Sequence, residues 1–360
     1  MADPTILFTG FPGFIGGRLI PKLLAGAPGT TVVALVEPRM VERARAAAAV
    51  IDPERVVIEP GDITDPKLGL SAARYAELAA TTTQVHHLAA IYDLAVPLAI
   101  AERVNLLGTQ HVLAFCRAAP NLERHHYVST CYVAGARSGR IMEHELVAGQ
   151  TFKNHYESTK FGAEVLVRAS MDDVPTTIYR PAIVVGDSLT GVTAKFDGPY
   201  YLLRMLQRLG AHQPIPQIGR GGAAFNVVPI DFVIDAIAAG TLDAEAVGET
   251  LHLCDPDPVS FAELMRTFSR AYAGREPSYN VPPAVLVRSL RIAAVRRMFG
   301  GTPSESIVYL NHAVEFDTTR ADLVLGRAGL RCPRFADYAP RLVEFFKAHQ
   351  KDPAFGRTPR

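Results

Sequence analysis

A glycine-rich loop near the N-terminus constrains the fold of this 360-residue chain more than any other feature. Gly10, Gly13 and Gly16 lie between a short apolar run at 5–9 and an amphipathic helical pattern at 15–24. Glycines at a strand-to-helix junction permit a tight turn and let backbone N–H groups approach a pyrophosphate, whose charge the helix N-terminus also attracts. The loop therefore predicts a dinucleotide site. Its candidate contacts are Gly10, Phe11, Gly13, Phe14, Ile15 and Gly16.

Apolar runs and helical patterns alternate through the first half of the chain. We expect strands at residues 5–9, 31–36, 56–58, 85–88, 126–129 and 176–179. We expect helices at residues 15–24, 41–50, 71–80, 96–118 and 156–170. Such alternation forms βαβ units and a parallel sheet with helices on both faces. Residues 1–185 are therefore predicted to be a dinucleotide-binding domain of the α/β class, with a Rossmann-type doubly wound parallel sheet.

The second half of the chain has a less regular pattern. Residues 186–350 predict a smaller, mostly helical substrate lobe, partly interleaved with the sheet through strands near 226–229 and 250–254. We expect its helices at residues 199–209, 231–240, 260–273, 283–299 and 335–349. Residues 351–360 are expected to be a loose tail because chain ends are ordered only where they are tied down.

The charge balance excludes two classes of protein. Lys and Arg total 37 and Asp and Glu total 36, so the formal net charge is +1. Bulk nucleic-acid binding needs a basic excess, and disorder needs high net charge with few apolar residues. Because 48% of the chain is hydrophobic, we expect a globular protein with no nucleic-acid partner.

The cysteines and the N-terminus bear on compartment and metal binding. The four cysteines form no CxxC pair, which argues against a disulfide framework and a cysteine zinc site, so no metal is expected. The chain begins without the basic and apolar segments of a signal peptide, and it contains no apolar run of about 18 residues. We therefore expect a cytoplasmic protein without a transmembrane segment.

Two charged residues follow the expected second strand. Glu37 lies 21 residues after Gly16, near the spacing of the acid that binds an adenosine ribose in dinucleotide sites. A carboxylate there favours NAD(H), because it repels the 2′-phosphate of NADP(H). Arg39 could instead pair with such a phosphate or be a solvated surface charge. These residues leave the choice of cofactor open.

Other candidate cofactor contacts lie at the carboxyl ends of strands, where ligands bind in such sheets. Asp62 and Ile63 follow the third strand, and Asp62 could accept from the adenine amino group or simply form a turn. Ala89 and Ala90 follow the fourth strand and would let a cofactor pass close to the backbone. The preceding His86 and His87 are expected to serve strand packing or to lie on the surface. Pro181, Ile183 and Val184 could wall a nicotinamide after the sixth strand.

Tyr156 and Lys160 form a YxxxK pair on one face of an expected helix. A phenol has an ordinary pKa near 10, and a neighbouring ammonium lowers it. Tyr156 could then donate a proton to a carbonyl oxygen. Thr130 is our choice for the hydroxyl that orients that oxygen, and Ser129 is the alternative. Asn105 could support a bound water near Lys160 or could occupy an ordinary surface position.

Together these motifs resemble the extended short-chain dehydrogenase/reductase superfamily over nearly the whole chain. The segments TGFPGFIG, VSTCYV and RPAIVVGDSLTG are similar to the fatty acyl-CoA reductase and thioester reductase-like branch. The resemblance implies that Thr130, Tyr156 and Lys160 form the catalytic set, with Lys160 also holding the nicotinamide ribose. It favours NADP(H), although the branch carries Arg where this chain has Glu37. The implied substrate is an acyl thioester, an aldehyde or a ketone.

Other enzymes of the same superfamily remain alternatives. These are a sugar-nucleotide epimerase or dehydratase with tightly bound NAD, and a dihydroflavonol reductase or 3β-hydroxysteroid dehydrogenase. A cofactor-sensing protein that catalyses no turnover is an alternative from another functional class. The basic amphipathic segment 283–299 could gate an acyl chain, meet a phosphopantetheine phosphate or touch an anionic membrane surface. It could also simply pack on one face and be solvated on the other, which is the usual character of such helices. A monomer and a homodimer are both compatible with the sequence.

Overall fold

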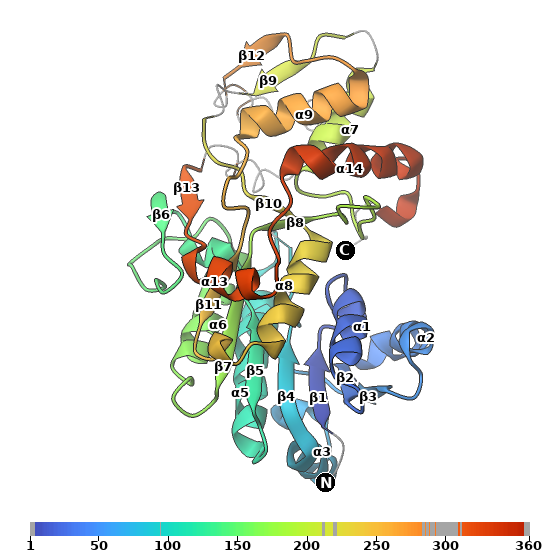
Figure 1. The fold of residues 1–360 in the computed structure, drawn as a ribbon, viewed down its shortest axis with the longest axis vertical. Coiled ribbons are helices and arrows are strands. Elements are labelled where there is room, and N and C mark those ends of the chain that lie inside the picture. Colours follow the sequence, from blue (N-terminus) through green and yellow to red (C-terminus); the bar gives the residue numbers. More distant parts are fainter. Residues whose placement is uncertain are drawn as a thin grey trace.

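A parallel sheet of seven strands forms the centre of the molecule, which is described here by a computed structural model. The structure describes residues 4–93, 95–210, 213–218, 222–282 and 312–355, and residues 285, 288, 292 and 309 between them. The strand order is β11-β7-β5-β4-β1-β2-β3 (Figure 1). The strands are β1 (Thr5–Thr9), β2 (Thr31–Val36), β3 (Val56–Pro60), β4 (Thr82–His87), β5 (Arg124–Val128), β7 (Thr176–Pro181) and β11 (Thr250–Leu253). The predicted Rossmann-type sheet is confirmed.

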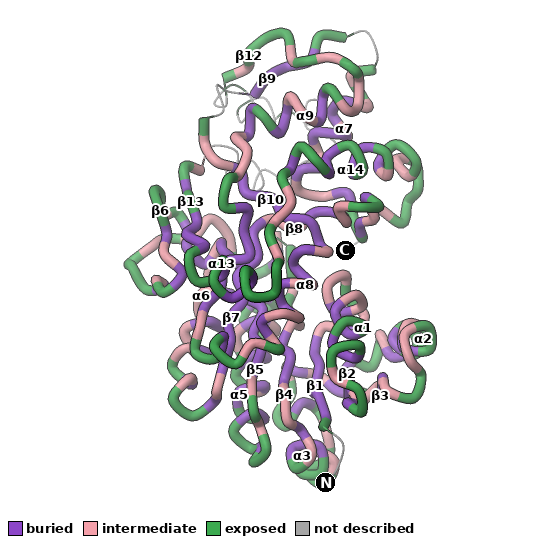
Figure 2. Tube along the Cα trace, in the orientation of Figure 1, coloured by how far each residue is buried: buried purple, intermediate pink, exposed green. Residues whose placement is uncertain are grey.

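Helices cover both faces of this sheet, as the burial of its strands requires (Figure 2). On one face pack α1 (Gly16–Gly26), α2 (Val41–Ile51), α8 (Ile230–Leu242) and α13 (Thr319–Arg327). On the other pack α3 (Ala72–Thr81), α5 (Gly108–Ala118) and α6 (His155–Arg168). The strand order reverses between β1 and β4, so the crevice for a ligand opens at the carboxyl ends of these two strands.

A second hydrophobic core lies beyond the carboxyl ends of the strands (Figure 1). Its helices are α7 (Tyr200–Leu209), α9 (Phe261–Ala273) and α14 (Phe335–His349). Two short strands, β9 (Pro216–Ile218) and β12 (Tyr279–Val281), pair beside α9. The pair β8 (Ile183–Val185) and β10 (Val227–Pro229) contributes to both cores, since Val185 packs in one and Val228 in the other. The chain therefore passes between the two cores more than once.

Short elements connect these layers. The strands β6 (Gly139–Ile141) and β13 (Val314–Phe316) pair in parallel. The expected helix 96–118 is built from α4 (Leu98–Ala101), a π-helical stretch η3 (Glu102–Leu107) and α5. The remaining short turns of helix are η1 (Pro38–Met40), η2 (Pro66–Gly69), η4 (Cys131–Ala134), η5 (Ala244–Ala246) and η7 (Pro353–Phe355).

The expected loose tail, residues 351–360, is described as far as residue 355. Residues 353–355 form η7, and the ring of Phe355 stacks on Phe196 with centroids 4.9 Å apart. The Phe355 carbonyl also accepts a hydrogen bond from Arg204. This part of the tail is held by aromatic packing that the sequence did not reveal, whereas residues 356–360 lie outside the described residues.

Candidate active site

The glycine loop folds tightly around the carbonyl oxygen of Gly10. A Cβ atom on Gly13 or on Gly16 would lie 2.7 Å from this oxygen, closer than real side chains come. Gly10 itself has a φ of +95°, and a Cβ there would meet the backbone nitrogen of Ala89 at 2.9 Å. Each predicted glycine is therefore required by the backbone path from β1 to α1.

The helix that follows the loop suits an anionic ligand. Ile15 is the N-cap of α1 and supplies no side-chain hydrogen bond, and the first turn carries no acidic residue. Such a helix end presents backbone N–H groups and positive dipole charge to a phosphate. Phe11, within the loop, is buried in the core that includes α1. The Arg18 guanidinium lies over the Phe14 ring, 4.5 Å from the ring centroid. The loop thus fits a dinucleotide pyrophosphate.

Glu37 and Arg39 lie together beyond the end of β2. Their side chains form an ion pair with 2.6 Å between Arg39 Nε and Glu37 Oε1, and they are 43% and 77% exposed. The two predicted adenosine contacts therefore neutralise one another in this structure. Exposed pairs of this kind are weak, because water and salt screen them.

The residues after β3 serve the turn that follows that strand. Asp62 accepts a hydrogen bond from the Thr64 backbone at 2.8 Å, which is the turn role anticipated as its alternative. Ile63 is buried, and its carbonyl accepts from His111. Contact of either residue with an adenine remains a prediction.

Asn105 fixes the segment after β4 from within η3. Its amide exchanges hydrogen bonds with the Ile91 backbone, accepting at 2.9 Å and donating at 3.4 Å, and it also donates to Thr159 at 3.1 Å. Because Asn105 is buried, the surface alternative is wrong. This clamp holds the backbone beyond Ala89, which is half-buried, and Ala90, which is exposed.

The predicted nicotinamide wall is divided between two strands. Pro181 ends β7 and is buried beside Leu253 of β11. Ile183 and Val184 begin β8 and are half-buried. Their part in binding a cofactor remains a prediction.

Tyr156 lies buried in the first turn of α6, close to the end of β5. The Thr130 side chain acts on the Tyr156 hydroxyl as a polar neighbour, and its own oxygen accepts from the Tyr132 backbone at 3.3 Å. Burial raises the pKa of Tyr156, and the Thr130 contact partly offsets this rise. Tyr156 is therefore a protonated phenol at neutral pH, which suits a proton donor.

Lys160 is also buried, but its ammonium is directed at β5. Its Nζ donates to the Tyr127 hydroxyl at 2.8 Å and to the Val128 carbonyl at 2.9 Å. Burial lowers the pKa of Lys160 to about 7, while Glu164 acts in the opposite direction. The expected lowering of the Tyr156 pKa by Lys160 is not found in this arrangement, because desolvation dominates and the ammonium bonds to β5.

Ser129, the alternative to Thr130, is committed to a buried ion pair. Its hydroxyl donates to Glu164 at 2.6 Å. Glu164 in turn accepts from Arg180, with 2.6 Å between Nη2 and Oε1, and both side chains are almost fully buried. Ser129 therefore joins the ends of β5 and β7 to α6, and Thr130 is the hydroxyl beside Tyr156.

Two aromatic residues near Tyr156 were missed by the sequence analysis. The Tyr92 ring stands edge-on to the Tyr156 ring, with centroids 5.2 Å apart, although Tyr92 is 55% exposed. Tyr309 donates to Glu157 at 2.5 Å and accepts from Asn154 at 2.7 Å. A tyrosine two residues after Ala90 could have been flagged, but no local signal marks Tyr309.

The four histidines of β4 and β5 are all buried in the sheet. His86 stacks on His126 with ring centroids 4.2 Å apart, and His87 bonds to Thr9 and Thr109. Burial lowers the pKa of each. Of the two expectations for His86 and His87, strand packing is confirmed and surface placement is wrong.

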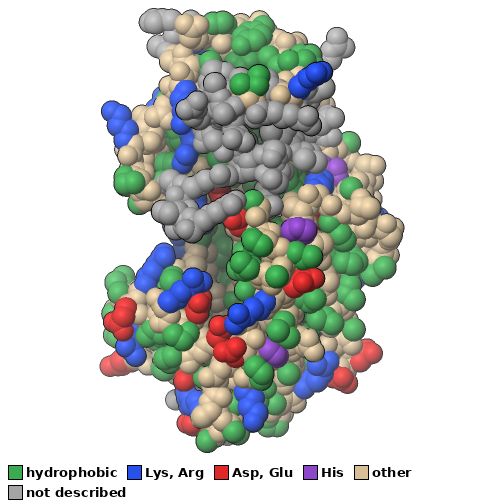
Figure 3. All heavy atoms as spheres, turned by 180° about the vertical axis from the view of Figure 1, so that it is seen from behind, with side chains coloured by type: hydrophobic (Ala, Val, Ile, Leu, Met, Phe, Trp, Pro, Cys, Tyr) green, Lys and Arg blue, Asp and Glu red, His purple; other side chains and the backbone are tan. Residues whose placement is uncertain are grey.

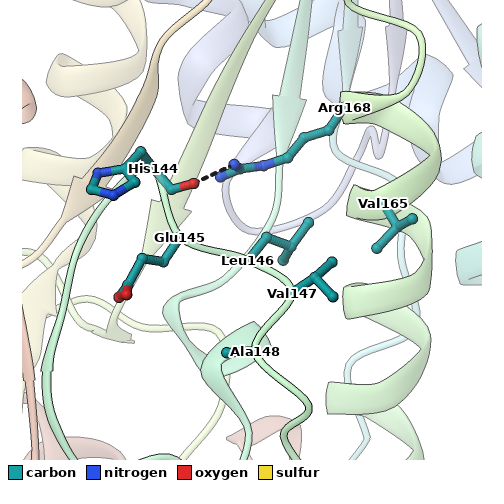
Figure 4. A pocket seen from close by; sticks show the side chains of 7 residues that line it. All are labelled: His144, Glu145, Leu146, Val147, Ala148, Val165 and Arg168. Carbon is teal, nitrogen blue, oxygen red and sulfur yellow. Dashed lines mark hydrogen bonds between the residues drawn. The ribbon is translucent and has the colours of Figure 1, made fainter.

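A surface pocket lies along the later turns of α6 (Figure 4). It is lined by His144, Glu145, Leu146, Val147, Ala148, Val165 and Arg168. Arg168 reaches across it to donate to the His144 carbonyl at 2.7 Å. Tyr156 and Lys160 do not line this pocket, so it is separate from the candidate site.

Charge, metal binding and membrane spanning can be assessed over the described residues. Basic and acidic side chains are interspersed on the face shown in Figure 3. No group of three His, Cys, Asp or Glu side chains in the described ranges is placed to hold a metal ion. Within those same ranges, none of the helices has the length and apolar character that a membrane span needs. The basic segment 283–299 lies almost entirely outside the described residues.

Comparison with known proteins gives a consistent family. The sequence pattern of the male sterility protein family matches residues 8–237. Aldehyde reductase lnbA of Aspergillus flavus is 27% identical over 70% of this chain, which spans 26% of that protein. Fatty acyl-CoA reductase wat of Drosophila melanogaster is 25% identical over 67% of this chain, which spans 54% of it.

A solved structure resembles the whole chain. The terminal R domain from the myxalamid PKS-NRPS biosynthetic pathway superposes with a TM-score of 0.82 and 26% identity. The match covers 100% of this chain and 93% of that domain. By contrast, the chain spans about a quarter of the length, or less, of several of the large synthetases it matches.

Proposed function

Because this chain belongs to the male sterility protein family, we propose that it is an NAD(P)H-dependent reductase of a thioester or aldehyde carbonyl. One observation carries the proposal: the protonated Tyr156 hydroxyl is buried beside the Thr130 hydroxyl at the carboxyl end of β5. Those hydroxyls can hold a carbonyl oxygen between them, next to the crevice at the carboxyl ends of β1 and β4.

The residues of the glycine loop would hold the dinucleotide. Gly10, Gly13 and Gly16 leave room for its pyrophosphate against the backbone, and the α1 N-terminus stabilises its charge. Glu37 would accept from an adenosine ribose hydroxyl, and its carboxylate favours NAD(H) over NADP(H). When bound, the reduced nicotinamide supplies a hydride.

Side chains of this protein would supply the proton and orient the substrate. Thr130 orients the carbonyl oxygen of the substrate, and Tyr156 donates its phenolic proton to that oxygen as hydride reaches the carbon. Burial keeps the Tyr156 proton in place at neutral pH, because it raises the pKa of the phenol. Lys160, which lies one turn further along α6, would hold the nicotinamide ribose.

The lobe around the second core is proposed as the substrate-binding region. Its helices α7, α9 and α14 lie beyond the strand ends that carry the candidate residues. Residues 186–350 would then contribute most substrate contacts, and residues 1–185 most cofactor contacts.

The test is a panel of acyl-CoAs, aldehydes and ketones with NADH and NADPH, followed by absorbance of the reduced cofactor. We expect stoichiometric cofactor oxidation with at least one thioester or aldehyde. Tyr156→Phe should lower kcat/KM by about 10²–10⁴-fold, the usual contribution of general acid catalysis. Nucleotide affinity should change less than about twofold, because the lost hydroxyl is not a predicted nucleotide contact.

Tyr179→Phe is a matched control, because Tyr179 is also buried but its hydroxyl faces His126 and the Ile237 carbonyl. Its kcat/KM should stay near the wild-type value. Cofactor retained through gel filtration, with turnover but no net oxidation, would instead support an epimerase. A Tyr156→Phe enzyme with full activity would contradict the role of Tyr156.

A further inference from the structure

A chain of buried polar side chains links the glycine loop to Lys160. The Thr9 hydroxyl lies 2.8 Å from His87 Nδ1, and His87 Nε2 lies 3.0 Å from the Thr109 hydroxyl. The Thr109 side chain also acts on the Tyr127 hydroxyl, since it opposes the rise in the pKa of Tyr127, and that hydroxyl accepts from Lys160 Nζ at 2.8 Å. The five side chains come from β1, β4, α5, β5 and α6, and all are buried.

The polar hydrogens of this series of buried side chains have one consistent arrangement. Thr109 donates to the Asn105 carbonyl at 2.6 Å, so its hydroxyl oxygen must accept from its other neighbours. His87 is neutral, because burial lowers its pKa, and it therefore has one donor and one acceptor nitrogen. Nε2 donates to Thr109 and Nδ1 accepts from Thr9, whose oxygen also accepts from the Ala89 backbone at 3.2 Å. Every member is satisfied.

Tyr127 is the last member of this series of side chains and bonds to Lys160. Burial raises its pKa, so it is a neutral phenol whose oxygen can accept from an ammonium. Its ring centroid also lies 4.4 Å from Lys160 Nζ. The other titratable groups that bear on Lys160 are Glu164 on α6 and His87 on β4. Glu164 is already paired with Arg180, so Tyr127 is the side chain that bonds directly to the ammonium.

We propose that Tyr127 is a positioning residue for Lys160, and that Thr9, His87 and Thr109 hold Tyr127 in place. These side chains, together called the relay, connect β1, which ends in the glycine loop, to Lys160 of the catalytic pair. This inference rests on the proposed function, where Lys160 holds the nicotinamide ribose. Tyr127→Phe would keep the ring and its volume and remove only the acceptor for the ammonium.

The test measures the pH midpoint at which Lys160 titrates. Whole protein labelled with ε-¹³C lysine is titrated by NMR, and the Lys160 signal is assigned by its loss in Lys160→Arg. Wild-type Lys160 should titrate near its pKa of about 7. In Tyr127→Phe the midpoint should fall by about one pH unit, because the charged form loses a hydrogen-bond acceptor. In the pH profile of kcat, the apparent pKa that belongs to Lys160 should fall by the same amount.

Tyr179→Phe is the matched control. Tyr179 is equally buried on the adjacent strand β7, but its hydroxyl faces His126 and the Ile237 carbonyl. Its removal should leave the Lys160 midpoint unchanged. A folded Tyr127→Phe protein with the wild-type midpoint would overturn the proposal.

Thr109 variants keep the proposal testable if Tyr127→Phe fails to fold. Thr109→Val should lower the Lys160 midpoint by a smaller amount, and Thr109→Ser should restore it. Equal midpoints in Thr109→Val and wild type would also overturn the relay. A protein that oxidises no cofactor with any substrate but shows these shifts would refute the proposed function and leave the relay intact.

Discussion

The two ends of the proposed cofactor site are built in opposite ways. Where β5 and β7 end, Ser129, Glu164 and Arg180 are buried and bonded to one another. Where β2 ends, Glu37 and Arg39 form a pair that is largely open to water. The same parallel sheet therefore carries a closed polar network at one place and an exposed ion pair at the other.

The difference teaches where substitutions should be costly. In the interior, a polar group that loses its partner cannot recover a water molecule, so the loss is large. At the surface, water and salt replace the lost partner. The catalytic end should therefore tolerate little change, whereas the adenosine end should be adjustable.

The largest expected effect is acid unfolding of the buried end. Burial lowers the pKa of His86, His125 and His252 to about 3, whereas unfolded histidine titrates near 6.5. Their contribution to stability is therefore complete above pH 6.5 and is lost as the pH falls toward 3. Burial raises the pKa of Glu143 to about 7, which opposes this loss. Because burial also lowers the pKa of His87 and His126, the free energy of unfolding, measured by urea denaturation, should fall by about 5 kcal/mol per pH unit well below pH 6.5.

The histidine variants separate the causes of this acid effect. His86→Phe keeps an aromatic ring between Phe8 and His126 and should reduce the slope by about 1.4 kcal/mol per pH unit. The exposed His144, changed to Phe, should leave the slope as it is. A slope that is the same in His86→Phe and wild type would rule out this buried histidine as a source.

The next effect concerns the buried ion pair. Glu164→Gln leaves the Arg180 guanidinium buried without its counter-charge and should cost about 3 kcal/mol of unfolding free energy. Glu344→Gln is the matched control, because Glu344 pairs with Arg341 on the exposed side of α14 and should cost under about 0.5 kcal/mol. Chemical denaturation measures both. Equal costs would remove the contrast between buried and exposed pairs.

A smaller effect is expected in the glycine loop. Gly13→Ala forces a Cβ against the Gly10 carbonyl, which must shift, and should weaken NADH binding by about tenfold. Gly17→Ala is the control from the same segment, because no atom lies within 4 Å of the added Cβ. Isothermal titration with NADH compares the two. Equal affinities would show that the tight loop does not shape the nucleotide site.

The last effect, equal in size to the one in the glycine loop, concerns cofactor preference. Glu37→Arg should shift the ratio of NAD(H) to NADP(H) affinities toward NADP(H) by about tenfold, because a repelling carboxylate becomes a second guanidinium. Glu42→Arg makes the same charge change on α2, where Glu42 pairs with Arg45, and should leave the ratio unchanged. Dissociation constants for both cofactors test this. An unaltered ratio in Glu37→Arg would contradict the assignment.

Local patterns predicted the parts of the fold that repeat a regular period. Strand 5–9 and helix 335–349 coincide with β1 and α14, because a continuous apolar run or a 3.6-residue apolar spacing is visible in the sequence. The three-residue strands β6, β9, β12 and β13 are too short to show a period and were not anticipated. Within the site, the glycine loop was predictable from its spacing, whereas the contact of Tyr127 with Lys160 joins residues far apart in the chain.

The sequence by itself determined the alternating fold, the glycine loop and the residue types available for proton transfer, since each depends on spacing along the chain. Only the tertiary structure decided which partners those residues have. The Ser129 hydroxyl bonds to Glu164 and the Thr130 hydroxyl lies beside Tyr156, although the two residues are neighbours in sequence. The Lys160 ammonium bonds to the Tyr127 hydroxyl. These choices depend on how buried donors and acceptors satisfy one another in three dimensions, which no local pattern records.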